Sequence, residues 1–198
     1  MSKILYFDCE TTGLKAHLNG IIQLAFVLEI DGEVVEERNI KMRPFEGDVI
    51  EEEALKVNGI TVEQMNGFME PNMAYMELFS VFNRHIKKYD KADKFFPAGF
   101  NVKFDLDFLS EFWRKASNDK YGMGSYCNWR SLDPLPVIYF LVVNGQIKLP
   151  NYKLATVCEY FGIKLDNAHD AMADIKATIE LIKLVNNIYI KGEVRDAM

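Results

Sequence analysis

The sequence lacks an excess of positive charge. Its 198 residues include 29 acidic and 23 basic side chains, for a formal net charge of −6. Proteins that bind nucleic acid mainly through its phosphates carry a broad basic surface, which this composition disfavours. A nucleic-acid enzyme whose local positive charge comes from bound metal ions is compatible with it.

Long apolar runs and cysteine are also scarce. No run approaches the ~18 apolar residues that cross a bilayer, and Asp8 follows the N-terminus too closely for a signal peptide. The three cysteines, Cys9, Cys127 and Cys158, are scattered without metal-binding spacing, which favours a reducing, cytoplasmic setting over a disulfide framework. No repeat or linker interrupts the chain, so we expect residues 1–198 to form a single domain without membrane association.

The patterning of apolar and polar residues predicts an α/β fold with a mixed sheet. Two apolar runs and a charged third one, with a turn at Asp31-Gly32, are typical of an antiparallel meander. We expect strands at 3–9, 21–30, 33–42, 94–100 and 131–133. We expect helices near 51–57, 61–66, 73–89, 104–115, 135–143, 152–161 and 168–190, and a loop at 117–129. Asp133 followed by Pro134 is typical of a helix N-cap and first turn.

Two acids, Asp8 and Glu10, end the first apolar run. Residues two apart on a strand point to the same face, so these carboxylates lie side by side and Cys9 faces the opposite way. Like charges this close repel unless a positive group lies between them. On this stretch alone, a solvated strand end beside a turn explains the pair as well as a functional site does.

Asp105 begins the apolar stripe of an expected helix. It is spaced i, i+3, i+4 and i+7 with Phe108, Leu109 and Phe112, whereas Asp107 points away from that stripe towards solvent. One explanation is a first-turn acid that the helix dipole stabilises. The other is a carboxylate that belongs to the same site as the first acid pair.

The last expected helix repeats this arrangement at Asp174. This acid shares a stripe with apolar residues that include Ala177, Leu181 and Val185, where an unpaired charge is very costly. No basic residue lies in that stripe, so a cation or several hydrogen-bond donors must stabilise the carboxylate. Asp170 shares the face and is the main rival of Asp174, although we interpret it as a helix-start residue.

Histidine occurs at three positions. We interpret His17, in a polar turn, and His85, beside lysines on a helix, as structural. His169 differs because it borders the acids, on the loop or first turn before Asp174. A neutral histidine there can accept the proton of an attacking water, because its ordinary pKa of about 6.5 is close to working pH.

The four carboxylates of Asp8, Glu10, Asp105 and Asp174 would repel one another unless hard divalent cations bind between them. Oxygen ligands suit Mg²⁺ or Mn²⁺. Two such ions about 3.5–4 Å apart clamp the attacking and leaving oxygens of a phosphodiester during its hydrolysis. The acids therefore predict a two-ion site for phosphodiester chemistry.

Three stretches resemble the motifs of the DEDDh 3′–5′ exonucleases. Residues 7–14, Phe-Asp-Cys-Glu-Thr-Thr-Gly-Leu, are similar to the first motif. Residues 101–105, Asn-Val-Lys-Phe-Asp, resemble the second, and residues 169–174, His-Asp-Ala-Met-Ala-Asp, resemble the third. The likeness covers nearly the whole chain and is strongest to the proofreading subunit of bacterial replicative polymerase and to stand-alone relatives.

The resemblance implies a ribonuclease H-like fold with a five-stranded sheet whose second strand is antiparallel to the rest. It implies that Asp8, Glu10 and Asp174 hold one metal ion. It also implies that Asp8 bridges to the second ion, helped by Asp105 directly or through water, and that His169 is the general base. The substrate contacts that it implies are Glu10, Thr11, Thr12, Gly13, Leu14, Asn101, Phe104 and His169.

The implied reaction releases nucleoside 5′-monophosphates from a single-stranded 3′ end, of DNA in the first instance and of RNA or short oligoribonucleotides as the alternative. A DNA polymerase or repair partner is left open, and the short stretch after the last expected helix favours a stand-alone nuclease. The non-enzymatic alternative is a scaffold of the same fold that binds nucleic acid or protein. Buried carboxylates, which cost stability, disfavour that alternative.

The expected loop at 117–129 carries aromatic residues that can stack single-stranded bases. We favour the simpler interpretation of an ordinary surface loop with Trp129 in the core. Weak candidates for phosphate contacts are Lys15, Lys103, Arg130, Lys148 and Lys153.

Overall fold

A mixed sheet forms the centre of the molecule, for which a computed structural model describes residues 2–117, 119–165 and 170–189. The described strands are β1 (Lys3–Thr11), β2 (Ile21–Ile30), β3 (Glu33–Lys41) and β4 (Phe96–Ala98), in the spatial order β3-β2-β1-β4. β2 pairs antiparallel with β1 and with β3, whereas β4 is parallel to β1. The predicted meander and the antiparallel second strand are therefore confirmed.

The fifth strand, predicted at 131–133, is wrong, and the described sheet has four strands. This segment makes an isolated bridge between Leu132 and Ala98, after an earlier one between Cys127 and Phe95. The bridged residues are three apart on the β4 side (98 − 95) and five apart on the other (132 − 127). Two extra residues thus break the register that a continuous strand requires.

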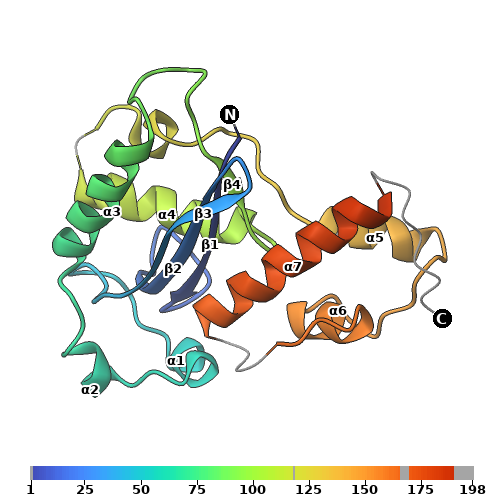
Figure 1. Cartoon of the computed structure of the whole chain (residues 1–198). Helices are drawn as coiled ribbons and strands as arrows, with labels where there is room; N and C mark the ends of the chain where they lie inside the picture. Colours follow the sequence, from blue (N-terminus) through green and yellow to red (C-terminus); the bar gives the residue numbers. More distant parts are fainter. Residues whose placement is uncertain (1, 118, 166–169, 190–198) are drawn as a thin grey trace.

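Helices cover both faces of the sheet (Figure 1). α3 (Pro71–His85) and α4 (Lys103–Ala116) pack on one face, and α7 (Ala171–Tyr189) packs on the other. The other described helices are α1 (Glu52–Asn58), α2 (Val62–Met65), α5 (Leu135–Val143), α6 (Leu154–Tyr160) and the 3₁₀ turn η1 (Gly122–Ser125). The predicted helices are confirmed to within a few residues at their ends, and η1 lies inside the expected loop.

The alternation of side chains along β1 divides them between two cores. Phe7 and Cys9 belong to the larger core, which α3 and α4 complete, whereas Tyr6 packs with residues of α7. Asp8 and Glu10 continue the row of Tyr6, so both carboxylates lie on the α7 face. This confirms that the two acids share a face and that Cys9 is a core residue on the opposite one.

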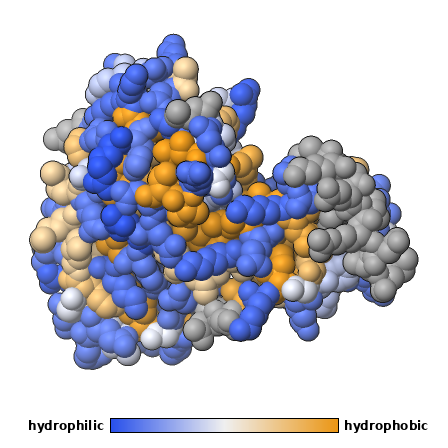
Figure 2. Space-filling model, in the orientation of Figure 1, coloured by the Kyte–Doolittle hydropathy of each residue, from blue (hydrophilic) through white to orange (hydrophobic). Residues whose placement is uncertain are grey.

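α5 and α6 form a smaller lobe against α7, at the right of Figure 1. Its buried residues are Ile138 and Leu141 of α5, Val157 of α6 and Leu181 of α7. Hydrophilic residues cover much of the face in Figure 2, and hydrophobic ones gather between the sheet and the lobe. None of the described helices combines the length and apolar character that a membrane span requires.

The contribution of the larger core to stability can be tested at Phe82. Its buried ring stacks on Trp113 at 5.8 Å and meets three further aromatic rings. Phe82→Ala leaves a cavity there, so we expect the free energy of unfolding in urea to fall by about 3–5 kcal/mol. The control Phe140→Ala, at a side chain that is 66% exposed, should change it by less than about 0.5 kcal/mol. Equal losses in both variants would contradict this core.

Candidate functional site

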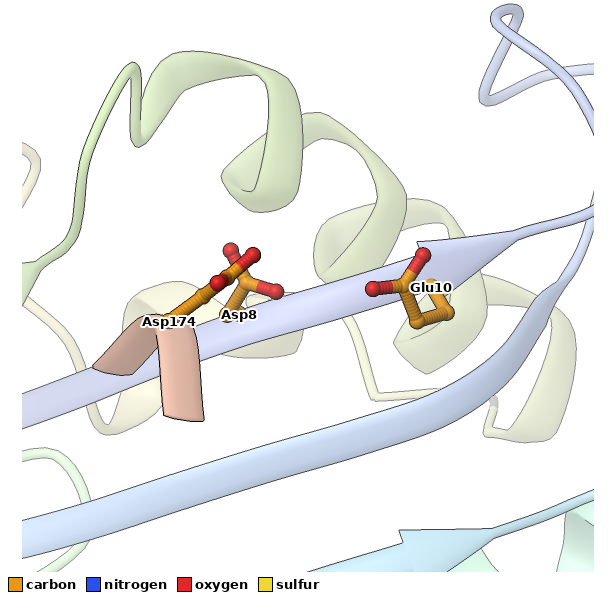
Figure 3. A group of neighbouring side chains, drawn as sticks. All are labelled: Asp8, Glu10 and Asp174. Carbon is orange, nitrogen blue, oxygen red and sulfur yellow. The ribbon is translucent and has the colours of Figure 1, made fainter. Parts of the chain in front are cut away.

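Three carboxylates meet between β1 and the first turn of α7 (Figure 3). Asp8, Glu10 and Asp174 each offer one oxygen, and these oxygens all lie within 4.8 Å of one another. Glu10 is buried, at 8% exposure, and the other two acids are partly buried. Hard divalent cations such as Mg²⁺ and Mn²⁺ favour oxygen ligands of this kind, so the donor set fits a metal ion.

The start of α7 decides between the two rival acids of that helix. Asp170 precedes the helix and its side chain accepts the Ala173 amide hydrogen at 3.2 Å, which confirms it as a helix-start residue. The Asp174 amide donates to the Asp170 carbonyl at 3.0 Å, in the first turn. The structure therefore brings Asp174 into the group of three carboxylates, as the sequence predicted.

Asp105 lies close to these acids but in the larger core. Its side chain is 4% exposed and accepts the Cys9 amide hydrogen at 3.0 Å. That bond holds β1 at the residue between Asp8 and Glu10. Asp107 is exposed and pairs with Lys103, so the predicted orientations of the two α4 acids are confirmed.

Burial and mutual repulsion raise the pKa values of the acids. Burial, helped by the charges of Asp174 and Asp170, raises the pKa of Glu10 from its ordinary value of 4.5 to about 7. Burial and then the charges of Asp105 and Asp174 hold the pKa of Asp8 well above its usual range. Burial also raises the pKa of Asp105 to about 8, although main-chain hydrogen bonds oppose the change. The site therefore favours bound protons or a cation.

The turn after β1 is buried and fixed by its own hydrogen bonds. The Thr11 hydroxyl donates to the Gly13 carbonyl at 2.7 Å, and the Thr12 hydroxyl donates to the Val49 carbonyl at 2.7 Å. A Cβ atom at Gly13 would lie 2.3 Å from a neighbouring side chain, so the position requires glycine. Leu14 follows the turn and is 78% exposed.

The second motif forms the turn between β4 and α4, where Asn101 has a left-handed conformation with φ of 56°. The Asp133 carboxylate accepts the amide hydrogens of Asn101 at 3.1 Å and of Val102 at 3.2 Å. It also accepts the Leu135 amide hydrogen at 2.9 Å, at the first residue of α5. The predicted N-cap at Asp133 is one residue too early, because the N-cap of α5 is Pro134. The first two bonds could not be predicted from the sequence, because an Asp-Pro pair signals only its own helix.

A narrow gap, with no room for a water molecule, lies beside Asp8. Its lining comes from β1, the end of β4 and α7, namely Tyr6, Phe7, Asp8, Ala98, Gly99, Phe100, Ile175 and Thr178. Phe104 lies outside this lining, with its ring 4.9 Å from that of Phe108. The structure thus places Phe104 in the packing of α4.

Histidines contribute nothing to the described part of the site. His169, the predicted general base, lies outside the described residues. His17 is exposed, and the Nε2 atom of His85 lies 3.7 Å from Glu36 at the end of α3. Neither belongs to the group of three carboxylates, which agrees with their predicted structural role.

Comparison with known proteins relates the chain to nucleases. A family model named RNase T and described as "Exonuclease" matches residues 5–182. Ribonuclease T of Shewanella frigidimarina is 27% identical over 191 residues, which cover 91% of this chain and 80% of that protein. A DNA polymerase III PolC-type protein of Pediococcus pentosaceus is 29% identical over 182 residues, which cover 92% of this chain.

Solved structures share the fold. Exonuclease I of E. coli in complex with a dT13 oligonucleotide matches with a TM-score of 0.79 and 23% sequence identity. The match covers 97% of this chain and 43% of that one. The chain likewise spans 11% of the PolC-type protein, so it corresponds to one part of each of these larger proteins.

The raised pKa values predict a metal-free protein that loses stability as the pH rises. Folding raises the pKa of Glu10 from 4.5 to about 7, so its stabilising contribution is present below pH 4.5 and is lost as the pH rises through about 7. We expect the Tm in EDTA to fall by about 5 °C between pH 5 and pH 8, measured by differential scanning fluorimetry.

Two further measurements test whether the titration of the acids causes this fall in Tm. Glu10→Gln should remove the share that Glu10 contributes, since the amide does not titrate, and should leave the shares of Asp8 and Asp105. Millimolar Mg²⁺ should raise the Tm more at pH 8 than at pH 5, because the ion competes with protons for the same oxygens. A Tm that does not change with pH in EDTA would contradict the assigned pKa values.

The hydrogen bonds of the Asp133 carboxylate lead to a second prediction about stability. Asp133→Ala leaves three main-chain N–H groups without their acceptor, so the free energy of unfolding should fall by about 1–3 kcal/mol in urea denaturation. Asp133→Asn keeps one carbonyl oxygen and should recover part of the loss. The matched control is Asp107→Ala, an exposed acid, with a change below about 0.5 kcal/mol. If Asp133→Ala is as stable as this control, the three bonds contribute nothing.

Proposed function

The chain belongs to the RNase T family of exonucleases, and from this premise we propose that it removes nucleoside 5′-monophosphates from the 3′ end of single-stranded DNA. The observation that carries this proposal is the group of three carboxylates, whose oxygens lie within 4.8 Å of one another. They lie on the α7 face of the sheet, beside the first turn of α7. We further propose that residues 1–198 act as a single exonuclease domain.

The acids are proposed as ligands of two divalent cations, Mg²⁺ or Mn²⁺. Asp8, Glu10 and Asp174 would hold one ion, and Asp8 with Asp105 would hold the other. Such ions, when bound, stabilise the charge on the attacking and leaving oxygens of the phosphodiester. The raised pKa values of Glu10 and Asp8 support this role, because they come from burial and then from repulsion among the acids, and a bound cation counteracts both. The hydrogen bond from Cys9 to Asp105 keeps β1 in position between the two sets of ligands.

The surroundings of the acids are proposed to bind the 3′-terminal nucleotide. Glu10 and the turn at 11–13 would contact its sugar, and the exposed Leu14 would pack on its base. Asn101 and Phe104 would shape the pocket, with Phe104 acting through the packing of α4. His169, next to the helix-start residue of α7, is proposed as the general base that accepts the proton of the attacking water.

Related proteins suggest both DNA and RNA as substrates. The Exonuclease I structures that share this fold hold dT13 and dA16 oligonucleotides, which supports single-stranded DNA. Ribonuclease T supports RNA by its name and covers most of this chain. The PolC-type relatives are polymerases, so a polymerase partner is a further proposal. We place DNA first and treat RNA as the second candidate.

Replacing one acid should abolish the reaction. We expect Asp8→Asn and Asp174→Asn each to lower the release of mononucleotides by more than about 10³-fold, because a lost metal ligand removes several kcal/mol of transition-state stabilisation. The assay follows the shortening of 5′-labelled single-stranded DNA in Mg²⁺, with circular dichroism as the test of folding. Asp107→Asn, an exposed acid of α4, is the matched control and should retain full activity.

Three outcomes would change the proposal. Full activity of either variant would refute the site. Faster shortening of an RNA of the same sequence would replace DNA by RNA as the substrate. If neither DNA, duplex nor RNA is shortened in Mg²⁺ or Mn²⁺, the protein is a non-catalytic scaffold of this fold.

A further inference from the structure

Trp129 is exposed, although its residue type favoured a core position. Of the two tryptophans, Trp113 is 0% exposed and Trp129 is 83% exposed. Tyr126, three residues earlier in the same loop, is fully buried. The predicted core position of Trp129 is therefore wrong. Base stacking by this loop was disfavoured because Trp129 was expected in the core, so that reason no longer holds.

A bulge in the segment beside β4 produces this exposure. The Asn128 amide donates to the Phe95 carbonyl at 2.8 Å, and the Leu132 amide donates to the Pro97 carbonyl at 2.8 Å. The segment thus advances four residues while β4 advances two, so two residues leave the ladder. The Asn128 side chain accepts the Arg130 amide hydrogen at 3.0 Å and closes the bulge. Bulges are a common means of redirecting a side chain next to a functional site.

Arg130 lies over the ring of Trp129, with its guanidinium carbon 4.6 Å from the ring centroid. This cation–π contact restrains the ring and keeps a positive charge beside it. The sequence neighbours of Trp129, namely Asn128, Arg130 and Ser131, are polar, which favours a polar or charged ligand over an apolar protein face. An exposed aromatic ring with an adjoining arginine is instead the combination that stacks a base and contacts the strand that carries it.

Hydrogen bonds connect the segment of the bulge to the turn that precedes α4, the helix of Asp105. The Gly99 amide donates to the Leu132 carbonyl at 3.1 Å, and the next residue, Asp133, holds the turn of the second motif. β4 lies between the bulge and β1. From the usual spacing between neighbouring strands and the usual rise per residue, the main chain of Trp129 is roughly 15 Å from that of Asp8. A single strand with its 3′ end at the acids covers this distance in a few nucleotides.

We infer that Trp129 and Arg130 form a second contact for the single-stranded substrate, a few nucleotides 5′ of the reacting end. One base stacks on the indole ring and Arg130 contacts a phosphate. The inference rests on the proposed function. It assigns substrate binding to Trp129 and Arg130 and leaves the chemical step to the carboxylates. Long substrates gain affinity from this contact, whereas substrates that end near the carboxylates do not reach it.

Binding can be tested without cleavage in the full-length Asp8→Asn variant. Because Trp113 is buried, quenching of tryptophan fluorescence by a dT12 oligonucleotide should come from Trp129. We expect Trp129→Ala to weaken binding about tenfold, as the loss of one stacked base does. Trp129→Phe should lose the quenching but keep most of the affinity, since it retains an aromatic face. Arg130→Gln should lower the slope of log affinity against log salt by about one.

Catalysis gives a second readout in the otherwise unaltered enzyme. We expect Trp129→Ala to raise the KM for dT12 about tenfold relative to the KM for p-nitrophenyl thymidine 5′-monophosphate, which is too short to reach the bulge. Phe140→Ala, which removes an exposed aromatic ring from α5, should leave this ratio unchanged. Equal effects of Trp129→Ala on both substrates, or no effect on either, would overturn the inference.

The two proposals fail in different ways. Quenching of Trp129 by dT12 in a protein that cleaves no substrate would refute the exonuclease and leave the binding contact in place. Cleavage of dT12 with an unchanged KM in Trp129→Ala would keep the exonuclease and refute the contact.

Discussion

Repulsion among Asp8, Glu10 and Asp174 is the constraint on which the rest of the structure depends. Their oxygens lie within 4.8 Å of one another, and burial intensifies the effect of each charge on the others. No local preference brings such groups together, so packing elsewhere must hold them. β1 is held between β2 and β4, and α7 is held by Ile175 against the sheet and by Leu181 against the lobe.

The two-residue period of β1 links the cores to the site. A slip of one residue between β1 and β2 would turn Asp8 and Glu10 into the larger core and Cys9 out to the α7 face. The long antiparallel ladder with β2, in which Asp8 pairs with Ala25, excludes that slip. The register irregularity comes after Glu10, where the strand has already delivered both acids and the buried turn begins.

Local periodicity indicated which way the acids point, and the resemblance to the exonuclease motifs was needed to assign them to one site. Asp8 and Glu10 follow from strand alternation, and Asp105 and Asp174 follow from apolar stripes on helices. The bonds of Asp133 to the second motif could not be found in this way, because they join main-chain groups more than 30 residues away. The exposure of Trp129 was missed for a related reason. Residue type favours burial of tryptophan, but the register of its segment against β4 decides where the ring points.

One break in register explains three features of the segment beside β4. They are the missing fifth strand, the bulge and the bonds of Asp133 to the second motif. A segment that paired regularly with β4 would direct its side chains alternately to the two faces of the sheet. Two extra residues free Trp129 and Arg130 from that alternation, and pairing resumes at Leu132, so that Asp133 still reaches Asn101. On either side of the bulge, Asn128 and Leu132 still donate to main-chain carbonyls along the β4 edge, which would otherwise be open to another sheet. The break in register therefore changes the course of the bulged residues and leaves the turn at Asn101 in place.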